Sequence, residues 1–144
     1  MDILIKAQRD YAAALLRYEF SQARQVLTID DPAEQKLADY GLSTSNRRYF
    51  LNAVTLAALN KEPTRPMHIA KLLGISRNAV DTMIDECHAN EWITIERDER
   101  SWRLIKATEF VVAISVRYAI RMNEIAHETG VAQSSIRLKI LTNG

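Results

Sequence analysis

The chain has 144 residues, of which 47% are hydrophobic and 26% charged, so it can bury a core and is too apolar to stay disordered. Its formal net charge of +1 does not by itself indicate nucleic-acid binding. Four glycines and three prolines favour long helices over a turn-rich β fold, and the single cysteine excludes an intramolecular disulfide and fits a reducing compartment.

Residues 3–27 carry apolar side chains at helical spacing on two adjacent stripes. The first stripe consists of Leu4, Tyr11, Leu15 and Tyr18, and the second of Ile5, Ala12, Leu16, Phe20, Ala23 and Leu27. Together they form an apolar face wider than one core contact needs. We therefore expect a long helix of which part meets another chain.

The next segment predicts two further helices. Asp30-Asp31-Pro32 is typical of a helix start, and Gly41 is expected to end that helix as a left-handed cap. Ser43 or Ser45 then caps a helix that runs toward residue 60, before the prolines of the stretch KEPTRP break the pattern.

A short helix, a turn and a longer helix follow. Residues 68–73 form the first helix, Gly74 allows a tight turn, and Ser76 caps a helix over residues 77–90. Small Ala70 allows a close helix crossing, and Ile75 fills the angle between the two helices. The inner face of the longer helix consists of Val80, Met83, Ile84 and Cys87. This arrangement predicts a helix-turn-helix unit.

The chain after Trp92 alternates like a hairpin. ITIE and WRLIK are the strands, and charged RDERS lies between them without an Asn-Gly turn, so the loop should be long. Residues 108–130 then predict a helix that is apolar around most of its circumference and must be buried on more than one side. Gly130 ends it, and a short final helix completes the packing.

The segment IAKLLGISRNAVDTMIDECHANEWITIERDERSWRLI resembles the winged helix-turn-helix core of the MarR-type transcriptional regulators, and DERS resembles their wing-tip Asp-x-Arg element. The layout matches over the whole chain, the motifs only over residues 69–105. The resemblance implies a mainly α fold with a small β-hairpin wing, in which a winged helix-turn-helix core is flanked by N- and C-terminal dimerisation helices. Within a single domain 1–144, residues 1–41 and 107–144 would dimerise, 43–106 would bind DNA, and 92–106 would form the wing.

The same resemblance implies a homodimeric transcriptional regulator, by default a repressor, that binds double-stranded DNA at a pseudopalindromic operator. A small apolar or phenolic effector could relieve it, with Tyr11, Tyr18 and Tyr118 as candidate cavity residues, although dimer-core packing is the simpler role for all three.

Eight residues are candidate DNA contacts. The helix over residues 77–90 would be the recognition helix, the one that enters the major groove. If Val80, Ile84 and Cys87 face inward, its outer face consists of polar residues. In the major groove, arginine can pair with guanine, asparagine can pair with adenine, and aspartate can accept a hydrogen bond from the cytosine amino group. In a narrow minor groove, arginine is attracted by the concentrated negative potential. The candidates are Ser76, Arg77, Asn78, Asp81 and Thr82 on the helix, and Arg97, Arg100 and Arg103 in the wing.

Asp98 would orient Arg100. Two positions depart from the family pattern: Glu91 stands where glycine is common, and Thr82 where a basic residue is common.

The sequence leaves plainer alternatives open. The outer helix face could be only solvated, and the wing could be a salt-bridged loop, because acidic residues lie between its arginines. Asp81, Asp85 and Glu86 motivate a different function, a winged-helix module that binds protein without sequence-specific DNA binding. If the DNA hypothesis holds, Asp85 and Glu86 lie beyond the groove or pair with a basic residue of a neighbouring element.

The sequence carries no pattern typical of an enzyme. No metal-ligand spacing links Cys87 to the histidines, and no phosphate-binding loop or catalytic triad stands out, so we expect no enzyme and no cofactor. Cys87 belongs to the core stripe and should be inert. No stretch of the sequence is long and apolar enough to span a membrane. Charged residues interrupt the N-terminal segment, which is not the pattern of a signal peptide, so we expect a cytoplasmic protein.

Overall fold

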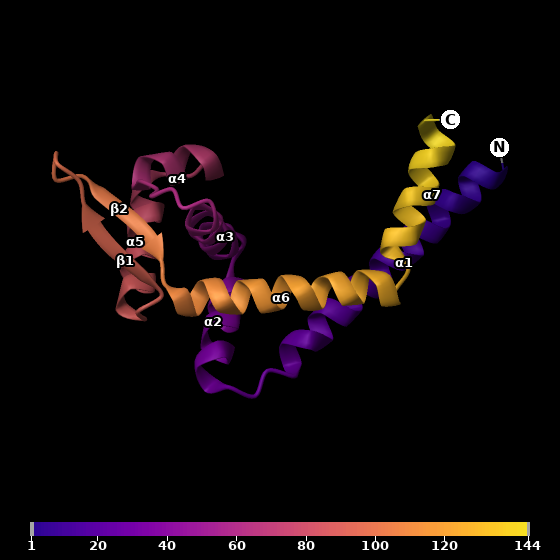
Figure 1. The fold of residues 1–144 in the computed structure, drawn as a ribbon, viewed down its shortest axis with the longest axis horizontal. Coiled ribbons are helices and arrows are strands. Elements are labelled where there is room, and N and C mark those ends of the chain that lie inside the picture. The colour runs from indigo at the N-terminus through magenta and orange to yellow at the C-terminus, as the bar shows by residue number, and fades with distance from the viewer. Residues whose placement is uncertain (1, 144) are drawn as a thin grey trace. The chain divides into compact units, whose positions relative to one another are not determined.

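A computed structural model describes residues 2–143 as helices joined by short connections and one hairpin (Figure 1). The helices are α1 (Asp2–Leu27), α2 (Pro32–Ser43), α3 (Ser45–Leu59), α4 (Pro66–Leu73), α5 (Arg77–Ala89), α6 (Glu109–Glu128) and α7 (Val131–Asn143). The strands are β1 (Ile93–Arg97) and β2 (Arg103–Ala107). The mainly helical fold with a β-hairpin is the one that the sequence predicts.

The chain divides into two compact units. The first combines residues up to Asp30 with those from Arg117 onward, and the second spans Asp31–Val116. Helix α2 packs on α3 and therefore belongs to the second unit, with the helix-turn-helix and the hairpin.

The hairpin pairs β1 with β2 antiparallel, with Ile93 opposite Ala107 and Arg97 opposite Arg103. The loop between the strands is long, as its composition predicts. Thr64 adds a one-residue bridge on the far side of β2, where its carbonyl accepts from the Ile105 amide at 2.7 Å. This bridge ties the link between α3 and α4 to the wing, a contact that no sequence pattern indicates.

The core of the second unit lies between α3, α4, α5 and the hairpin. All four residues predicted for the inner face of α5 are buried. Trp92 is buried at the start of the hairpin and meets the Tyr40 ring edge-on, with 5.1 Å between ring centroids. The largest fully buried side chains of this core are Phe50, Ile69, Ile84 and Ile105. Helix α5 is thus held in the core by one face, while Arg77, Asn78 and Thr82 lie exposed on it.

The turn before α5 follows the sequence prediction. Gly74 is left-handed at φ 66°, and the Ser76 hydroxyl accepts from the Ala79 amide at 3.1 Å as the N-cap. A similar prediction for Gly41 is wrong, because α2 continues through it to Ser43. A Cβ on Gly41 would lie 3.4 Å from Leu51, at van der Waals distance, so this position lies where α2 packs on α3 and is not a cap.

Thr44, between the two serines proposed as caps, is the residue that caps α3. Its hydroxyl accepts from the Arg47 amide at 3.1 Å. The serine predictions are therefore wrong by one position, within the usual uncertainty of helix ends.

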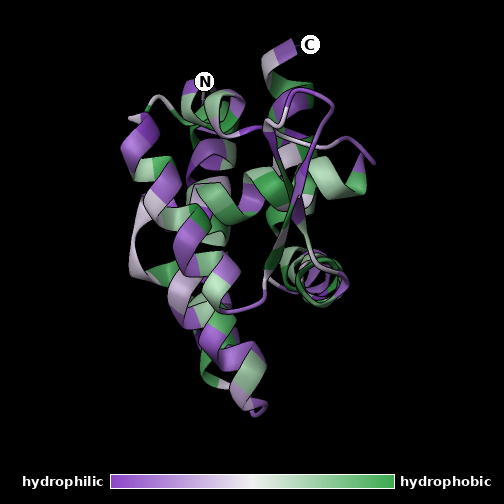
Figure 2. Ribbon diagram, turned by 90° about the vertical axis from the view of Figure 1, so that its left-hand side faces the viewer, coloured by the Kyte–Doolittle hydropathy of each residue, from purple (hydrophilic) through white to green (hydrophobic). Residues whose placement is uncertain are grey.

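In the first unit, α1 packs along α7, and the two helices lie side by side (Figure 1). Ala7 and Ala14 are buried, which lets the helices approach closely. The first predicted stripe of α1 is half-buried beside them, whereas much of the second stripe is exposed. Figure 2 shows hydrophobic and hydrophilic residues mixed along the helices, as amphipathic faces require. The exposed large apolar residues of α1 and of the C-terminal helices include Leu16, Phe20, Leu27, Ile120, Ile136 and Ile140.

Helix α6 does not find all the burial that its composition predicts. Val111 and Met122 are buried, and Ile114 packs on the core of the second unit. Ile120, in contrast, is 58% exposed. The expectation of burial on several sides is therefore not met within one chain.

Candidate nucleic-acid interface

The first turn of α5 presents polar side chains to solvent. Ser76, Arg77, Asn78 and Thr82 are exposed, while Val80, two positions from Asn78 and Thr82, is fully buried. Four backbone amides at a helix N-terminus lack helical partners and carry partial positive charge, which favours an anion such as a phosphate. The Thr82 hydroxyl donates back to the Asn78 carbonyl at 3.0 Å, so its proton is already used within the helix.

Asp81 connects α5 to the wing. Its Oδ1 accepts from Arg103 Nη2 at 2.5 Å and from Arg77 Nε at 3.3 Å. Arg103 also faces Arg97 across the hairpin, and like charges in that position repel. The Asp81 carboxylate therefore offsets the charge of a wing arginine that lies opposite another arginine, and it joins α5 to the wing.

The wing loop is held by Asp98. Its Oδ1 accepts from the backbone amides of Arg100 at 2.8 Å and Trp102 at 3.0 Å, and its Oδ2 accepts from Arg65 Nη2 at 2.7 Å. The amide of Trp102 is the main cause that lowers the pKa of Asp98, with the Arg100 amide and the Arg65 charge adding to it. Asp98 thus orders the loop backbone, a different role from orienting the Arg100 side chain as the sequence predicts.

Trp102 is 53% exposed at the wing. The guanidinium carbon of Arg65 lies 4.8 Å from the centre of the Trp102 ring, and that of Arg100 lies 5.9 Å from it. Both distances fit cation–π contacts. The wing tip therefore presents an indole between two guanidinium groups.

Glu86 is paired, as one alternative from the sequence anticipated. Its Oε1 accepts from the Tyr40 hydroxyl at 3.0 Å and from Arg47 Nε at 3.3 Å, and its Oε2 accepts from Arg47 Nη2. The Arg47 hydrogen bond is the main cause that lowers the Glu86 pKa. Burial, followed by the neighbouring Cys87 and Glu86, raises the pKa of Tyr40. This pairing anchors the C-terminal half of α5 to α2 and α3.

Cys87 is fully buried, and burial raises the pKa of its thiol to about 11. The thiolate is the reactive form, so this cysteine is chemically quiet at neutral pH, as the sequence predicts. Among residues 2–143, no group of three or more His, Cys, Asp or Glu side chains could hold a metal ion.

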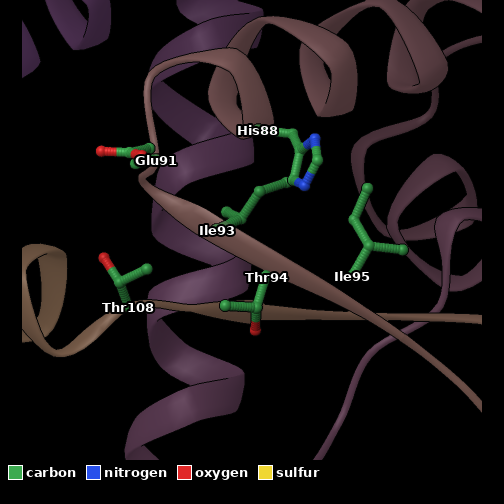
Figure 3. A pocket seen from close by; sticks show the side chains of 6 residues that line it. All are labelled: His88, Glu91, Ile93, Thr94, Ile95 and Thr108. Atoms are coloured by element: carbon green, nitrogen blue, oxygen red, sulfur yellow. The ribbon is translucent and has the colours of Figure 1, made fainter.

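A hollow of about 460 Å³ follows β1 from the end of α5 to the start of α6 (Figure 3). His88, Glu91 and Thr94 are exposed at its rim, so it is open to solvent. Glu91 has a left-handed backbone at φ 62°, at the position where glycine is common in the family that the sequence resembles. The lining consists of His88, Glu91, Ile93, Thr94, Ile95 and Thr108.

Three solved structures show what fold this is. MepR of Staphylococcus aureus, a transcription regulator of the multidrug efflux pump MepA, superimposes with a TM-score of 0.57 and 18% identity over 77% of this chain and 81% of its own. Oxidised MarR from E. coli superimposes with a TM-score of 0.51 and 21% identity, over 76% of this chain and 83% of its own. A MarR-like transcriptional regulator from Thermotoga maritima superimposes with a TM-score of 0.53 and 16% identity, over 90% of this chain and 88% of its own. The chain has the MarR-type winged-helix fold.

The MarR-type fold confirms the architecture predicted from the sequence, with the helix-turn-helix in α4 and α5 and the wing in β1 and β2. The chain matches no protein-family profile and no curated relative. Identities of 16–21% support the fold and not the role of any single residue. No helix within residues 2–143 is both long and apolar enough to cross a membrane.

Three of the eight predicted residues meet in the second unit, two from α5 and one from β2. Arg77, Asp81 and Arg103 are in contact, and Arg97 lies opposite Arg103 with its Nη1 donating to the Ser101 carbonyl at 2.7 Å. Arg65 is not among the eight candidates from the sequence. Its position directly before Pro66 marks a helix start, but nothing in the pattern indicates that it reaches the wing.

Proposed function

We propose that this protein is a transcriptional regulator that binds double-stranded DNA as a homodimer, with α5 of each chain in the major groove and each wing beside a minor groove. The observation that carries the proposal is the first turn of α5, where Arg77 and Asn78 are exposed on a helix whose opposite face is locked in the core. Helix-turn-helix proteins read base edges with this part of the recognition helix. Two proteins with the same fold, MepR and the one from Thermotoga maritima, are a transcription regulator and a MarR-like transcriptional regulator.

The acidic residues of α5 argue less against DNA than the sequence suggested. Asp81 is paired with Arg103 and Arg77, and Glu86 is paired with Arg47 and Tyr40. Their charges are therefore largely neutralised inside the protein. Asp85 is exposed but lies two helical turns beyond Arg77, away from the first turn.

In this proposal, a second copy of the chain covers the exposed apolar residues of the first unit. Phe20 is 69% exposed, Ile120 58% and Ile140 65%, and burial of such apolar surface against a partner is favourable. The three belong to α1, α6 and α7, so all three helices of the unit contribute. A symmetric dimer would present two copies of α5 to one duplex and so match a pseudopalindromic operator.

Repression by blocking a promoter and relief by a small apolar or phenolic effector complete the proposal. A ligand would act by changing the separation of the two recognition helices, which must match one helical turn of DNA, about 34–36 Å. The protein would then need no enzymatic activity and no cofactor.

The test is a mobility shift with purified full-length protein and a pool of genomic fragments at low salt. A shift that survives competition by random duplex, and identifies a preferred fragment, is the expected result. No shift at micromolar protein would contradict the proposal and favour the winged-helix protein-binding module, for which a partner would then be sought.

Replacement of Arg77 by alanine should weaken binding to the preferred fragment by about 1–3 kcal/mol, because a guanidinium–base contact is lost. The matched control is Arg9→Ala, which removes the same charge from an exposed position of α1 in the other unit. Equal losses for both variants would mean that Arg77 contributes only general charge.

A further inference from the structure

Asp81 holds two arginines with one oxygen atom. Oδ1 accepts from Arg103 Nη2 and from Arg77 Nε, which lies one helical turn before it on α5. The side chains of Arg77, Asp81 and Arg103 are 42%, 37% and 24% exposed, so the three groups meet at the surface rather than in the core. A surface ion pair stabilises a fold only slightly. Stabilisation of the fold is therefore not a sufficient explanation for this arrangement, and an effect on DNA binding is the alternative.

The geometry leaves one edge of Arg77 free. Its Nε is directed to Asp81, and no contact is found for its two terminal nitrogens within residues 2–143. Two parallel N–H groups on the terminal nitrogens match the O6 and N7 acceptors of guanine. A guanidinium that is already held on one side loses less freedom when it binds in this way.

From this contact we infer that Asp81 is the specificity-determining residue of the interface: it aims Arg77 at guanine and withholds Arg103 from the phosphates. The inference rests on the proposed function. It changes the role of Asp81 from a direct cytosine contact, as the sequence suggested, to a positioning residue that acts through the two arginines.

Two effects on DNA binding follow, with opposite signs. Without the carboxylate, Arg103 and Arg77 are free to pair with any phosphate, so affinity for random DNA should rise, and its dependence on salt should steepen by about one unit of log–log slope per arginine released. Arg77 would also lose its fixed orientation, so the preference for guanine at one base position of each half-site should weaken. Loss of fold would instead lower binding to all sequences.

The experiment compares full-length wild type, Asp81→Asn and Asp85→Asn. Asp85→Asn is the matched control, since it makes the same charge change one turn further along α5 at an exposed aspartate. Dissociation constants are measured over a series of salt concentrations for a random duplex and for the duplex preferred by wild type. Asp81→Ser serves as a second variant, and circular dichroism checks that each variant is folded.

We expect Asp81→Asn to bind random duplex more tightly with a steeper salt dependence, and to lose about fivefold or more of the ratio between preferred and random duplex. Asp85→Asn should change both quantities much less. If wild type binds DNA selectively and both variants of Asp81 behave like Asp85→Asn, the inference is wrong while the proposed function stands. If wild type binds no DNA, both fall together.

Discussion

Replacement of Ile120 by serine should weaken the dimer. Ile120 is 58% exposed on α6, in a stripe with exposed Ala113 and Val116. Full burial of an isoleucine side chain contributes about 1.5–3 kcal/mol, so the exposed share contributes about 0.9–1.7 kcal/mol per chain if a partner covers it. Two symmetric copies double this to about 1.7–3.5 kcal/mol, which raises the dissociation constant of the dimer by about 15- to 300-fold.

The assay is sedimentation velocity over a range of protein concentrations that spans dissociation. Leu56→Ser is the matched control, because Leu56 is 57% exposed on α3 in the other unit. We expect the control to retain the wild-type dissociation constant. An unchanged constant for Ile120→Ser, or equal weakening by Leu56→Ser, would refute the reasoning that the apolar residues of the first unit are covered by a second copy.

Four further predictions concern the second unit. Gly74→Ala should lower the free energy of unfolding by about 1 kcal/mol, since alanine is strained at positive φ. Glu91→Gly should raise the free energy of unfolding by up to about 1 kcal/mol, because left-handed strain is removed, with part of the gain offset by the entropy of glycine. Urea titration measures both, and a change of the opposite sign would contradict the prediction concerned. Glu86 has a lowered pKa in the fold, so its pairing with Arg47 stabilises above the ordinary value of 4.5 and is lost as pH falls through the lower folded value. The loss of melting temperature in Glu86→Gln should therefore be full at neutral pH and shrink on acidification below about pH 4.5, and a difference that does not depend on pH would contradict this. Cys87, with a pKa of about 11, should react with iodoacetamide at pH 8 only as fast as the protein unfolds; rapid labelling of the folded protein would contradict its burial.

The helix-turn-helix could be predicted because its signals are local. Gly74 and Ser76 act on the backbone next to them, and the inner face of α5 follows from spacing along one helix. Gly41 shows the limit of such reasoning. A glycine that ends a helix and a glycine inside a helix look alike in sequence, and only the fold shows that α2 continues through Gly41.

The contacts that organise the candidate interface could not be predicted, because they join residues far apart in the chain. Arg65 reaches Asp98 and Trp102 only because Thr64 pairs with β2, and a one-residue bridge has no periodic pattern. The partner of Asp81 on β2 likewise depends on the register of the hairpin. The sequence identified which residues carry charge near the interface, while the fold decides which of those charges remain available.

The most direct test of DNA reading by paired copies of α5 is selection of bound duplexes from a randomised pool by the purified full-length protein at low salt. The predicted result is an enriched inverted repeat whose half-site centres lie about 10–10.5 base pairs apart, with a guanine preference in each half-site that Arg77→Ala abolishes. A pool that shows no enrichment, or enrichment that Arg77→Ala leaves unchanged, would contradict the account.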